Sequence, residues 1–424
     1  MVWSFDSHRE GTVDYDVLIV GARVAGASLA LLLGERGHRV LLVDRDRFPS
    51  DTLSTHFVGP QHVPLLAKLG VLEDVEASDL RRIRRSRTYV EDLVFEGPMA
   101  PPYALVPRRD RFDAILVEHA CRRGGVELAE RTTAEGLVEE GGRVAGAVLR
   151  TAGGVARTVR ARWVVGADGK FSKVAEWVGA RSYEQVPALR PGYYGYFLGL
   201  KPLPETTLEI FFTPGQMGFI FPMEPGLDCL ALELQPPDFD AFRAEPVETF
   251  LSRFRALPGM AERLADARLE DRIFGTRGVD NYLRQPYGPG WALNGDAGCL
   301  KDPSTGTGMG DALTQSFLLA DALDAALRGE DEKAALGAFH QKRDEAMLPG
   351  YRFTIDYTRA ADIPTEALDG LRGALTSPAL ARSLVAALPA KLPELMPSAM
   401  PRLTAIANGF AAARRAGVAA DGQR

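Results

Sequence analysis

The chain has little cysteine, and its cysteines are far apart. The three are Cys121, Cys229 and Cys299, and no two of them form a C-x-x-C pair. The sequence therefore indicates neither a disulfide framework nor a zinc site, and it favours a reducing compartment. No stretch approaches the roughly 20 consecutive apolar residues that a membrane span needs. The polar N-terminus does not resemble a signal peptide, so we expect a cytoplasmic protein with no membrane partner.

Lysine is also scarce, and most of the basic residues are arginine. The net charge of -6 is modest. Together with the many alanines and glycines, the arginine content is typical of a GC-rich gene rather than of a nucleic-acid surface. We expect no nucleic-acid partner. The 424 residues, of which 46% are hydrophobic, are enough to form several buried cores.

The best-organised segment lies near the N-terminus. An apolar run at Asp16–Val20 is followed by a turn at Gly21–Gly26 and by small aliphatic residues at Ala27–Leu33. A second apolar run, Val40–Val43, ends in Asp44. This order predicts strand, loop, helix and strand, with a carboxylate where a dinucleotide-binding fold holds the adenosine ribose.

One residue departs from the dinucleotide-binding fingerprint G-x-G-x-x-G. Arg23 occupies the middle glycine position, where the backbone approaches the pyrophosphate. Its guanidinium could neutralise phosphate charge while its amide still donates a hydrogen bond. Alternatively, the side chain points to solvent.

Two later segments have the same strand-to-turn character. Ala161–Val165 is an apolar run that leads into the turn Gly166–Gly169. Trp291–Asp311 reads as a strand, a Pro/Gly-rich loop and a helix start. The free amides at such a helix start favour a partly negative group, and a reduced flavin ring is one candidate.

These three motifs, in this order, resemble those of the class A flavoprotein monooxygenases of the p-hydroxybenzoate hydroxylase fold. That superfamily also contains flavin halogenases and isoprenoid reductases of the geranylgeranyl reductase type. The similarity extends from about Asp16 to about Thr404. It implies an α/β fold: a Rossmann-like FAD-binding domain with a mixed sheet, an inserted antiparallel β-sheet substrate domain and a C-terminal helical region.

The resemblance also implies domain boundaries. The FAD-binding domain would be discontinuous, over residues 1–80, 105–183 and 275–330, and the substrate sheet would take residues 81–104 and 184–274. Residues 331–416 would form the helical region, and 417–424 would be a disordered tail. In the C-terminal part of the chain we expect a helix at about Met309–Leu327, a second over Glu330–Met347, and short helices broken by prolines beyond Pro349.

By the same resemblance, FAD would be held by residues from all three motifs. Asp44 would bind the ribose, Arg45 would flank the adenine, and Asp296 would accept a hydrogen bond from the ribityl chain. Arg109, or Arg108 in the alternative register, would support the phosphates. The full predicted set is Gly21, Arg23, Ala25, Gly26, Asp44, Arg45, Ser54, Thr55, Arg109, Asp168, Gly295, Asp296, Pro303, Gly306, Gly308 and Met309.

Three residues are catalytic candidates. His56 could donate a proton at the flavin, because imidazole titrates near neutral pH, although a hydrogen-bonded loop histidine is the simpler interpretation. Lys301 could influence the flavin electrostatically, or it could lie at the surface. Pro303 would lie beside the ring.

The region between the second and third motifs predicts a mostly antiparallel sheet. Its strands would be Tyr193–Phe197, Thr207–Phe212, Gly218–Pro222 and Cys229–Leu234. Candidate substrate-binding residues are the aromatic ones Tyr194, Tyr196, Phe211, Phe219 and Phe221, although many sheet aromatics are only core.

Two further features bear on the reaction. The strand Met217–Pro222 lacks the tryptophan signatures of halogenases (W-x-W-x-I-P) and isoprenoid reductases (Y-x-W-x-F-P), and it shares only F-P with the latter. The arginines between Arg81 and Arg87 could receive NADPH phosphates, or they could lie on a solvated strand edge.

The expected function is therefore hydroxylation of an aromatic or polyketide-like small molecule in secondary metabolism. NAD(P)H would reduce FAD transiently, and O2 would react at the flavin C4a position as a hydroperoxide. A reductase is the alternative; a halogenase or a non-catalytic flavin-binding protein is less expected. The protein would be a monomer or a homodimer.

Overall fold

The structure is a computed structural model that describes residues 13–359, so the predicted tail 417–424 and most of the predicted helical region lie outside it. The chain divides into two compact units. Among the described residues, unit 1 comprises residues 13–80, 107–187 and 279–348, and unit 2 comprises residues 81–106, 188–278 and 349–359.

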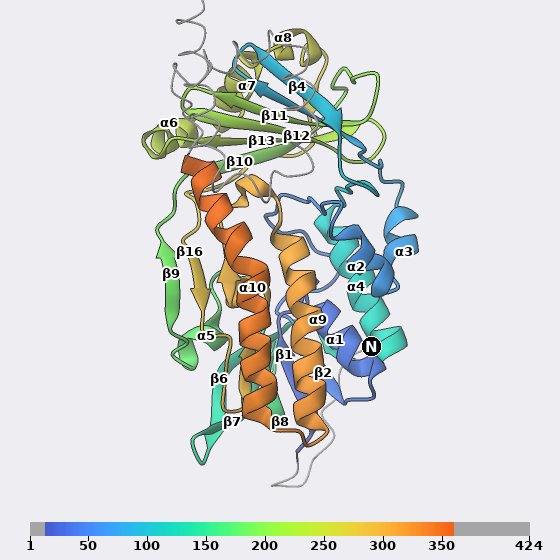
Figure 1. Cartoon of the computed structure of the whole chain (residues 1–424), viewed down its shortest axis with the longest axis vertical. Helices are drawn as coiled ribbons and strands as arrows, with labels where there is room; N and C mark the ends of the chain where they lie inside the picture. Colours follow the sequence, from blue (N-terminus) through green and yellow to red (C-terminus); the bar gives the residue numbers. More distant parts are fainter. Residues whose placement is uncertain (1–12, 360–424) are drawn as a thin grey trace, which may run out of the picture. The chain divides into compact units, whose positions relative to one another are not determined.

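Unit 1 contains an eight-stranded mixed sheet with helices packed beside it, and a separate three-stranded sheet of β19, β16 and β9 (Figure 1). Its strands are β1 (Tyr15–Val20), β2 (Val40–Val43), β5 (Glu127–Ala129), β6 (Thr132–Glu140), β7 (Arg143–Thr151), β8 (Arg157–Gly166), β9 (Ser182–Val186), β16 (Asn281–Arg284), β17 (Tyr287–Gly288), β18 (Trp291–Leu293) and β19 (Cys299–Leu300). Its helices are α1 (Val24–Glu35), α2 (Val63–Lys68), α3 (Leu72–Glu76), α4 (Arg109–Gly124), α5 (Lys173–Trp177), η2 (Gly295–Ala297), η3 (Pro303–Thr305) and α9 (Gly308–Leu327).

Four neighbouring strands of this sheet end side by side. The strand order is β18-β8-β1-β2-β5, with each neighbouring pair parallel. Val20 at the end of β1 pairs with both Val43 of β2 and Gly166 of β8, and Gly166 pairs in turn with Leu293 of β18. The central strands are apolar and buried on both faces, as parallel strands require. All three sequence motifs therefore begin at one edge of one sheet.

Helix α1 is covered on nearly every side. It is built mostly from alanine and leucine, and it packs against both α4 and α9 (Figure 1). A helix that is apolar all round belongs in a core rather than at a surface. This packing fixes the N-terminal end of α1, which follows the Gly21–Gly26 turn.

Helix α10 (Glu332–Arg359) begins in unit 1 and continues into unit 2, because Pro349 does not end it. The expected end of this helix at Met347 is therefore wrong. The proline is exposed, and the helix continues through it although its nitrogen cannot donate a backbone hydrogen bond. Within unit 1, Arg343 anchors α10. Its buried guanidinium donates to the Tyr183 hydroxyl and, at 3.0 Å, to the Arg284 carbonyl.

Unit 2 is a mixed sheet with short helices on one face (Figure 1). Its elements are β3 (Arg85–Val90), β4 (Leu93–Pro98), β10 (Gly192–Leu198), β11 (Thr207–Thr213), β12 (Gln216–Pro222), β13 (Leu227–Leu234), η1 (Pro236–Asp238), α6 (Phe239–Ala244), α7 (Pro246–Arg255), α8 (Met260–Arg263), β14 (Arg268–Leu269) and β15 (Phe274–Thr276). The four predicted strands are β10 to β13, paired antiparallel in the order β10-β13-β12-β11. Strand β3 adds to β11 in parallel.

The arginine-rich segment does not form a strand edge. Strand β3 lies between β11 and β4, so the interpretation as a solvated edge is wrong. Arg85 and Arg87 both donate to the Glu96 carboxylate across the β3–β4 pair, and Arg81 pairs with Asp228. Arg85 and Arg87 are separated by one residue, so their side chains lie on the same face of β3 and bind the same carboxylate on β4.

Candidate functional site

The glycines of the first motif are required by close backbone contacts. A Cβ at Gly26 would lie 1.7 Å from the Gly21 carbonyl oxygen, and Gly21 has a φ of +103°. A Cβ at Gly21 would lie 2.4 Å from the Ala167 carbonyl oxygen, which belongs to the second motif. The first two motifs are therefore in backbone contact, and a residue with a side chain at Gly21 would clash with the second motif.

A buried asparagine joins the first motif to the third. The Asn294 amide donates to the Ala25 carbonyl and to the Ser316 hydroxyl, each at 2.9 Å. Ser316, on α9, also donates to Ala25, at 3.1 Å. Gly295 follows directly, and a Cβ there would lie 2.8 Å from the Cβ of Ala25. These bonds position the start of α1 against η2 and α9.

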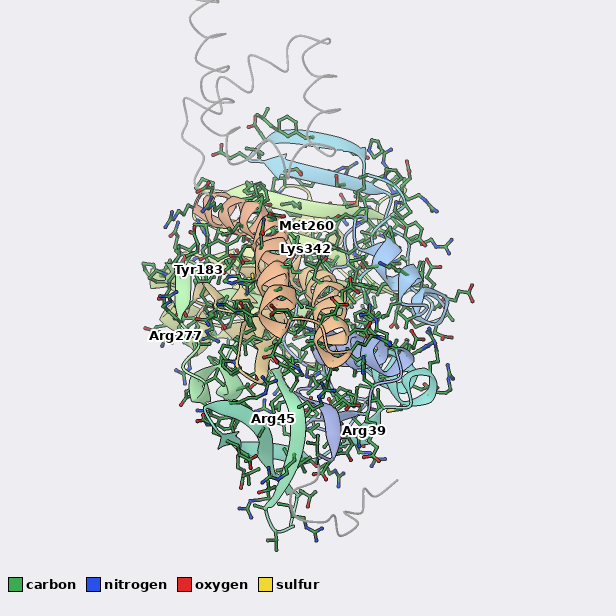
Figure 2. The ribbon with its side chains drawn as sticks, turned by 60° about the horizontal axis from the view of Figure 1, so that its bottom comes forward. Arg39, Arg45, Tyr183, Met260, Arg277 and Lys342 are labelled. Atoms are coloured by element: carbon green, nitrogen blue, oxygen red, sulfur yellow. The ribbon has the colours of Figure 1, made fainter. Side chains whose placement is uncertain are left out.

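Asp44 is fixed by backbone amides. Its carboxylate accepts hydrogen bonds from Ala22, at 2.7 Å, and from Asp46, at 2.9 Å. Burial raises the pKa of Asp44, and the two backbone donors oppose that shift. Arg45 is exposed beside it (Figure 2). The predicted ribose ligand thus has a set orientation at the end of β2.

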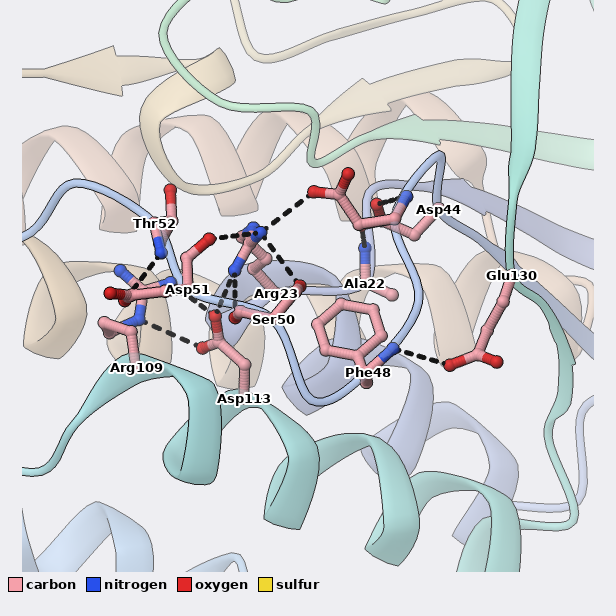
Figure 3. Close-up of polar contacts among 11 residues, drawn as sticks. Ala22, Arg23, Asp44, Phe48, Ser50, Asp51, Thr52, Arg109, Asp113 and Glu130 are labelled. Carbon is pink, nitrogen blue, oxygen red and sulfur yellow. Dashed lines mark hydrogen bonds and ion pairs between the residues drawn. The ribbon is translucent and has the colours of Figure 1, made fainter.

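Arg23 does not point to solvent, so that alternative is wrong. Its backbone is extended, with a φ of −84°, which any residue adopts at a helix N-cap. Its guanidinium lies 2.9 Å from the carboxylates of both Asp46 and Asp113 (Figure 3). Arg109 donates to the same Asp113 carboxylate through Nε, at 3.1 Å, and Nη2, at 2.9 Å.

Asp296 is a desolvated carboxylate. Burial raises its pKa to about 6, although Arg109 pulls in the opposite direction. Within residues 13–359 the carboxylate accepts no hydrogen bond, and the Tyr282 hydroxyl donates instead to the Asp296 backbone carbonyl, at 2.9 Å. The side chain keeps some exposed surface. Such a carboxylate suits a ligand hydroxyl that donates to it.

The Lys301 side chain is buried, so the alternative of a surface position is wrong. Its side chain is 7% exposed, and its ammonium lies 2.7 Å from the Asp311 carboxylate in the first turn of α9. Asp302 caps η3 by accepting from the Ser304 amide, at 3.0 Å. The loop that contains Pro303, Gly306 and Gly308 is therefore closed by an ion pair. Gly306 has a φ of +67°, and a Cβ there would contact Phe57 at 3.1 Å.

His56 does not have the properties of a proton donor. Burial lowers its pKa to about 3, and repulsion from Arg109 and Arg108 adds to this. The imidazole is therefore neutral at pH 7, which favours the interpretation as a structural loop histidine. Its backbone φ is +57°, and its amide donates to the Ser54 hydroxyl at 3.1 Å. Thr55 lies between them, partly buried.

Asp168 caps a helix. Its carboxylate accepts from the amides of Lys173, at 2.7 Å, and Val174, at 3.2 Å, and from the Ser172 hydroxyl. These donors are at the N-terminus of α5, where orphan amides need acceptors. Asp168 therefore stabilises the start of α5.

The aromatic candidates of unit 2 lie on two different faces. Tyr194 and Phe219 both pair with Ala231, and Tyr196 and Phe221 both pair with Cys229, so these four aromatics share a face. Phe211 lies on the other face, in the core formed with α6, α7 and α8. It stacks on Tyr89 at 4.3 Å between ring centroids. Its assignment to the substrate set is wrong, because the helices cover it.

Several residues of the site were not predicted from the sequence. They are Asn294, Ser316, Asp113, Asp46, Asp311 and His62. Two had a visible signal: Asn294 is a polar residue at the end of a buried strand, and Asp113 follows Arg109 at the helical i,i+4 spacing. The others depend on contacts between segments far apart in the chain.

The residues of unit 1 fit FAD by three observations. The glycine loop forms a backbone turn at the N-terminus of α1, which suits a pyrophosphate. Asp296 offers a carboxylate with no donor among residues 13–359. A Cβ at Gly308, the first residue of α9, would meet open space, whereas Gly310 two residues on is packed against His62. A planar ring could therefore approach the start of α9 closely.

Two kinds of feature are absent from the described residues. No group of His, Cys, Asp and Glu between residues 13 and 359 could hold a metal ion. No helix in this part of the chain is long and apolar enough to cross a membrane.

Known proteins with similar sequences include a reductase and a hydroxylase. The digeranylgeranylglycerophospholipid reductase of Methanosarcina mazei is 28% identical over 330 residues, which cover 75% of this chain and 77% of that protein. The aklavinone 12-hydroxylase DnrF of Streptomyces peucetius subsp. caesius is 28% identical over 363 residues, covering 77% and 71%.

The fold also matches solved structures. That of the flavin-dependent brominase Bmp2 superposes with a TM-score of 0.76 at 19% identity, covering 97% of this chain and 100% of that chain. A family model described as an FAD binding domain matches residues 14–348. The chain therefore belongs to this FAD-binding family, and it is an FAD-dependent oxidoreductase.

Proposed function

We propose that this oxidoreductase is a hydroxylase-type monooxygenase that acts on an aromatic or polyketide-like small molecule of secondary metabolism. NAD(P)H would be the reductant and O2 the oxidant. In the balanced reaction one oxygen atom enters the substrate, the other leaves as water, and NAD(P)H gives up two electrons. Bound FAD would supply the redox chemistry.

The observation that carries the proposal is the aromatic face of unit 2. Tyr194, Tyr196, Phe219 and Phe221 share this face, and Phe274 stacks on Tyr194 at 5.0 Å between ring centroids. Aromatic side chains bind planar ligands through stacked and edge-to-face contacts. The 28% identity to an aklavinone hydroxylase supports the same substrate class.

The proposed residues of unit 1 would bind and orient the cofactor. The backbone turn Gly21–Gly26 and Arg109 would hold the pyrophosphate. The Asp44 carboxylate would accept hydrogen bonds from the ribose hydroxyls. Asp296 would accept a hydrogen bond from the ribityl chain.

The free amides at the start of α9 would face the edge of the flavin ring that becomes negative on reduction. The ion pair between Lys301 and Asp311 would keep that helix start in place.

The proposal is tested by isotope labelling. The enzyme, loaded with FAD and supplied with NADPH, is incubated under ¹⁸O2 with hydroxylated anthraquinones as probes. We expect one ¹⁸O atom in the product for each NADPH consumed in coupled turnover. A product that gains two hydrogens and no label would overturn the proposal.

A reductase is the second candidate, and the similarity to the Methanosarcina reductase favours it. Such an enzyme would transfer two electrons and two protons to a carbon–carbon double bond and need no oxygen. Anaerobic incubation with a geranylgeranyl lipid and a chemical reductant distinguishes the two. Saturation of the lipid under these conditions would support the reductase.

A further inference from the structure

One carboxylate in unit 1 bridges two guanidinium groups from different elements. Asp113 on α4 is fully buried, and its Oδ2 accepts from Arg23 Nη1 and from Arg109 Nη2, both at 2.9 Å. Its Oδ1 accepts from Arg109 Nε at 3.1 Å. Arg23 precedes α1, and Arg109 is the first residue of α4, so Asp113 links the two helix starts (Figure 3).

The rest of the Arg23 guanidinium is engaged by the segment that follows β2. Nη2 donates to the Asp46 carboxylate at 2.9 Å, to the Ser50 hydroxyl at 3.2 Å and to the Asp51 carbonyl at 3.1 Å. Nη1 also donates to the Ser50 carbonyl at 3.2 Å. Both amino nitrogens therefore bind protein acceptors (Figure 3). The side chain therefore connects the start of α1 with α4 and with the segment Asp46–Asp51.

The charges balance within this cluster. Burial would lower the pKa of Arg23, but Asp113 and Asp46 hold it above its ordinary value, so the guanidinium stays charged. Without Arg23, the buried Asp113 would keep only Arg109, and Asp46 would lose its cation. A buried charge that loses a partner is costly, so the neighbouring segments would rearrange.

We propose that Arg23, at the middle glycine position of the fingerprint, is a positioning residue. Its guanidinium forms what we call a structural tie, namely its hydrogen bonds and ion pairs to Asp113 and to the segment Asp46–Asp51. It holds the segment Asp46–Asp51 against the turn Gly21–Gly26, and through Asp113 it sets the orientation of Arg109. The inference rests on the proposed cofactor residues and explains how the loop works without the glycine. Because the backbone at position 23 is extended, a residue with a side chain is accommodated there. The contact with Asp113 connects that side chain to α4.

The test restores the glycine. Arg23→Gly completes G-x-G-x-x-G, so a loop that needed the middle glycine would bind FAD more tightly. We expect the opposite, a loss of FAD affinity of about tenfold, because a buried charge pair is broken. The dissociation constant is measured by fluorescence titration of the apo-protein, and the thermal midpoint of the apo-protein is recorded for each variant. Affinity equal to or tighter than that of the unchanged protein would overturn the proposal.

Two further experiments separate a structural tie from a simple positive charge. Arg23→Lys keeps the charge but not the fork geometry, and we expect it to lose most of the affinity that Arg23→Gly loses. If Arg23→Lys binds FAD as the unchanged protein does, charge alone suffices and the tie is refuted. In a cycle of Arg23→Met and Asp113→Asn, we expect the double variant to lose less than the product of the single losses. Independent, multiplicative losses would contradict the proposal.

Asp46→Asn provides a milder variant should the others fail to fold. Asp46 is 40% exposed, so its loss removes one contact of Arg23 and leaves the bridge at Asp113. A two- to threefold loss of FAD affinity is expected, of the order of one partly exposed ion pair; unchanged affinity would count against the tie. These titrations need no turnover, so a failure of the monooxygenase proposal would leave them interpretable.

Discussion

The Lys301 ammonium lies 2.7 Å from the Asp311 carboxylate, and this pair closes the loop that contains Pro303, Gly306 and Gly308. Both side chains are largely buried, at 7% and 14% exposed. The Thr307 hydroxyl also donates to Asp311, at 3.3 Å. The loop conformation at the start of α9 is therefore coupled to one buried charge pair.

Breaking this pair should destabilise the protein strongly. Lys301→Met leaves the Asp311 charge uncompensated, and we expect the free energy of unfolding to fall by about 3 kcal/mol. Urea denaturation measures it. The control is the double variant Lys301→Met with Asp311→Leu, which removes both charges and should be more stable than the single variant. A single variant as stable as the unchanged protein would show that the pair contributes nothing.

Two glycines at the start of α9 should respond differently to alanine. A Cβ at Gly310 would lie 2.0 Å from Nδ1 of the buried His62, so Gly310→Ala should lower the thermal midpoint of the apo-protein. Gly308→Ala meets open space and should leave the midpoint unchanged or raise it slightly.

FAD titration of the variants Gly308→Ala and Gly310→Ala tests where the flavin ring lies. If the flavin fills the space at Gly308, Gly308→Ala should weaken FAD binding despite an intact fold. Combining Gly310→Ala with His62→Ala should recover stability by removing the clash. Unaltered FAD affinity in Gly308→Ala would remove this helix start from the site.

The buried His56 should make the protein sensitive to acid. Its folded pKa of about 3 lies below the ordinary 6.5, so between these values the unfolded chain binds a proton that the folded chain does not. Stability should therefore fall as the pH is lowered from 7 towards 4. His56→Asn, which tolerates the positive φ, should lose less stability over this range. Parallel pH curves for the two proteins would contradict the assignment.

Phe211 should matter for stability and not for the cofactor. It stacks on Tyr89 in the core of unit 2, and Phe211→Ala should cost about 3–5 kcal/mol of unfolding free energy. FAD affinity, which depends on unit 1, should be unchanged at temperatures where the variant is folded. A variant of normal stability would show that the helices do not pack on this residue as described.

The sequence predicted the parts of the fold that depend on local patterns. Apolar runs ending in glycine predicted β1, β8 and β18, and parallel pairing then brings their ends together. The contacts of Arg23 could not be predicted, because its partner Asp113 is 90 positions away. The burial of the Lys301 side chain could not be predicted either, since a lysine is buried only when a carboxylate such as Asp311 lies opposite.

The alternation of side chains along β11 does not predict which face of the sheet Phe211 occupies. A period of two separates the residues of a strand into two faces, but it does not say which face the helices cover. Helices α6, α7 and α8 follow β13 in the chain, and they cover the face of Phe211 rather than that of Phe219. Tertiary packing alone decides this point.

FAD titration of Asp296→Ala tests the cofactor site most directly. The unchanged apo-protein should bind FAD with one flavin per chain. The variant should bind at least about tenfold more weakly, because a hydrogen bond to a charged group is worth roughly 1.5–3 kcal/mol. Its apo form should stay folded, since the substitution removes a desolvated carboxylate with no donor among residues 13–359. An Asp296→Ala protein with full flavin occupancy and an unchanged dissociation constant would contradict the site described above.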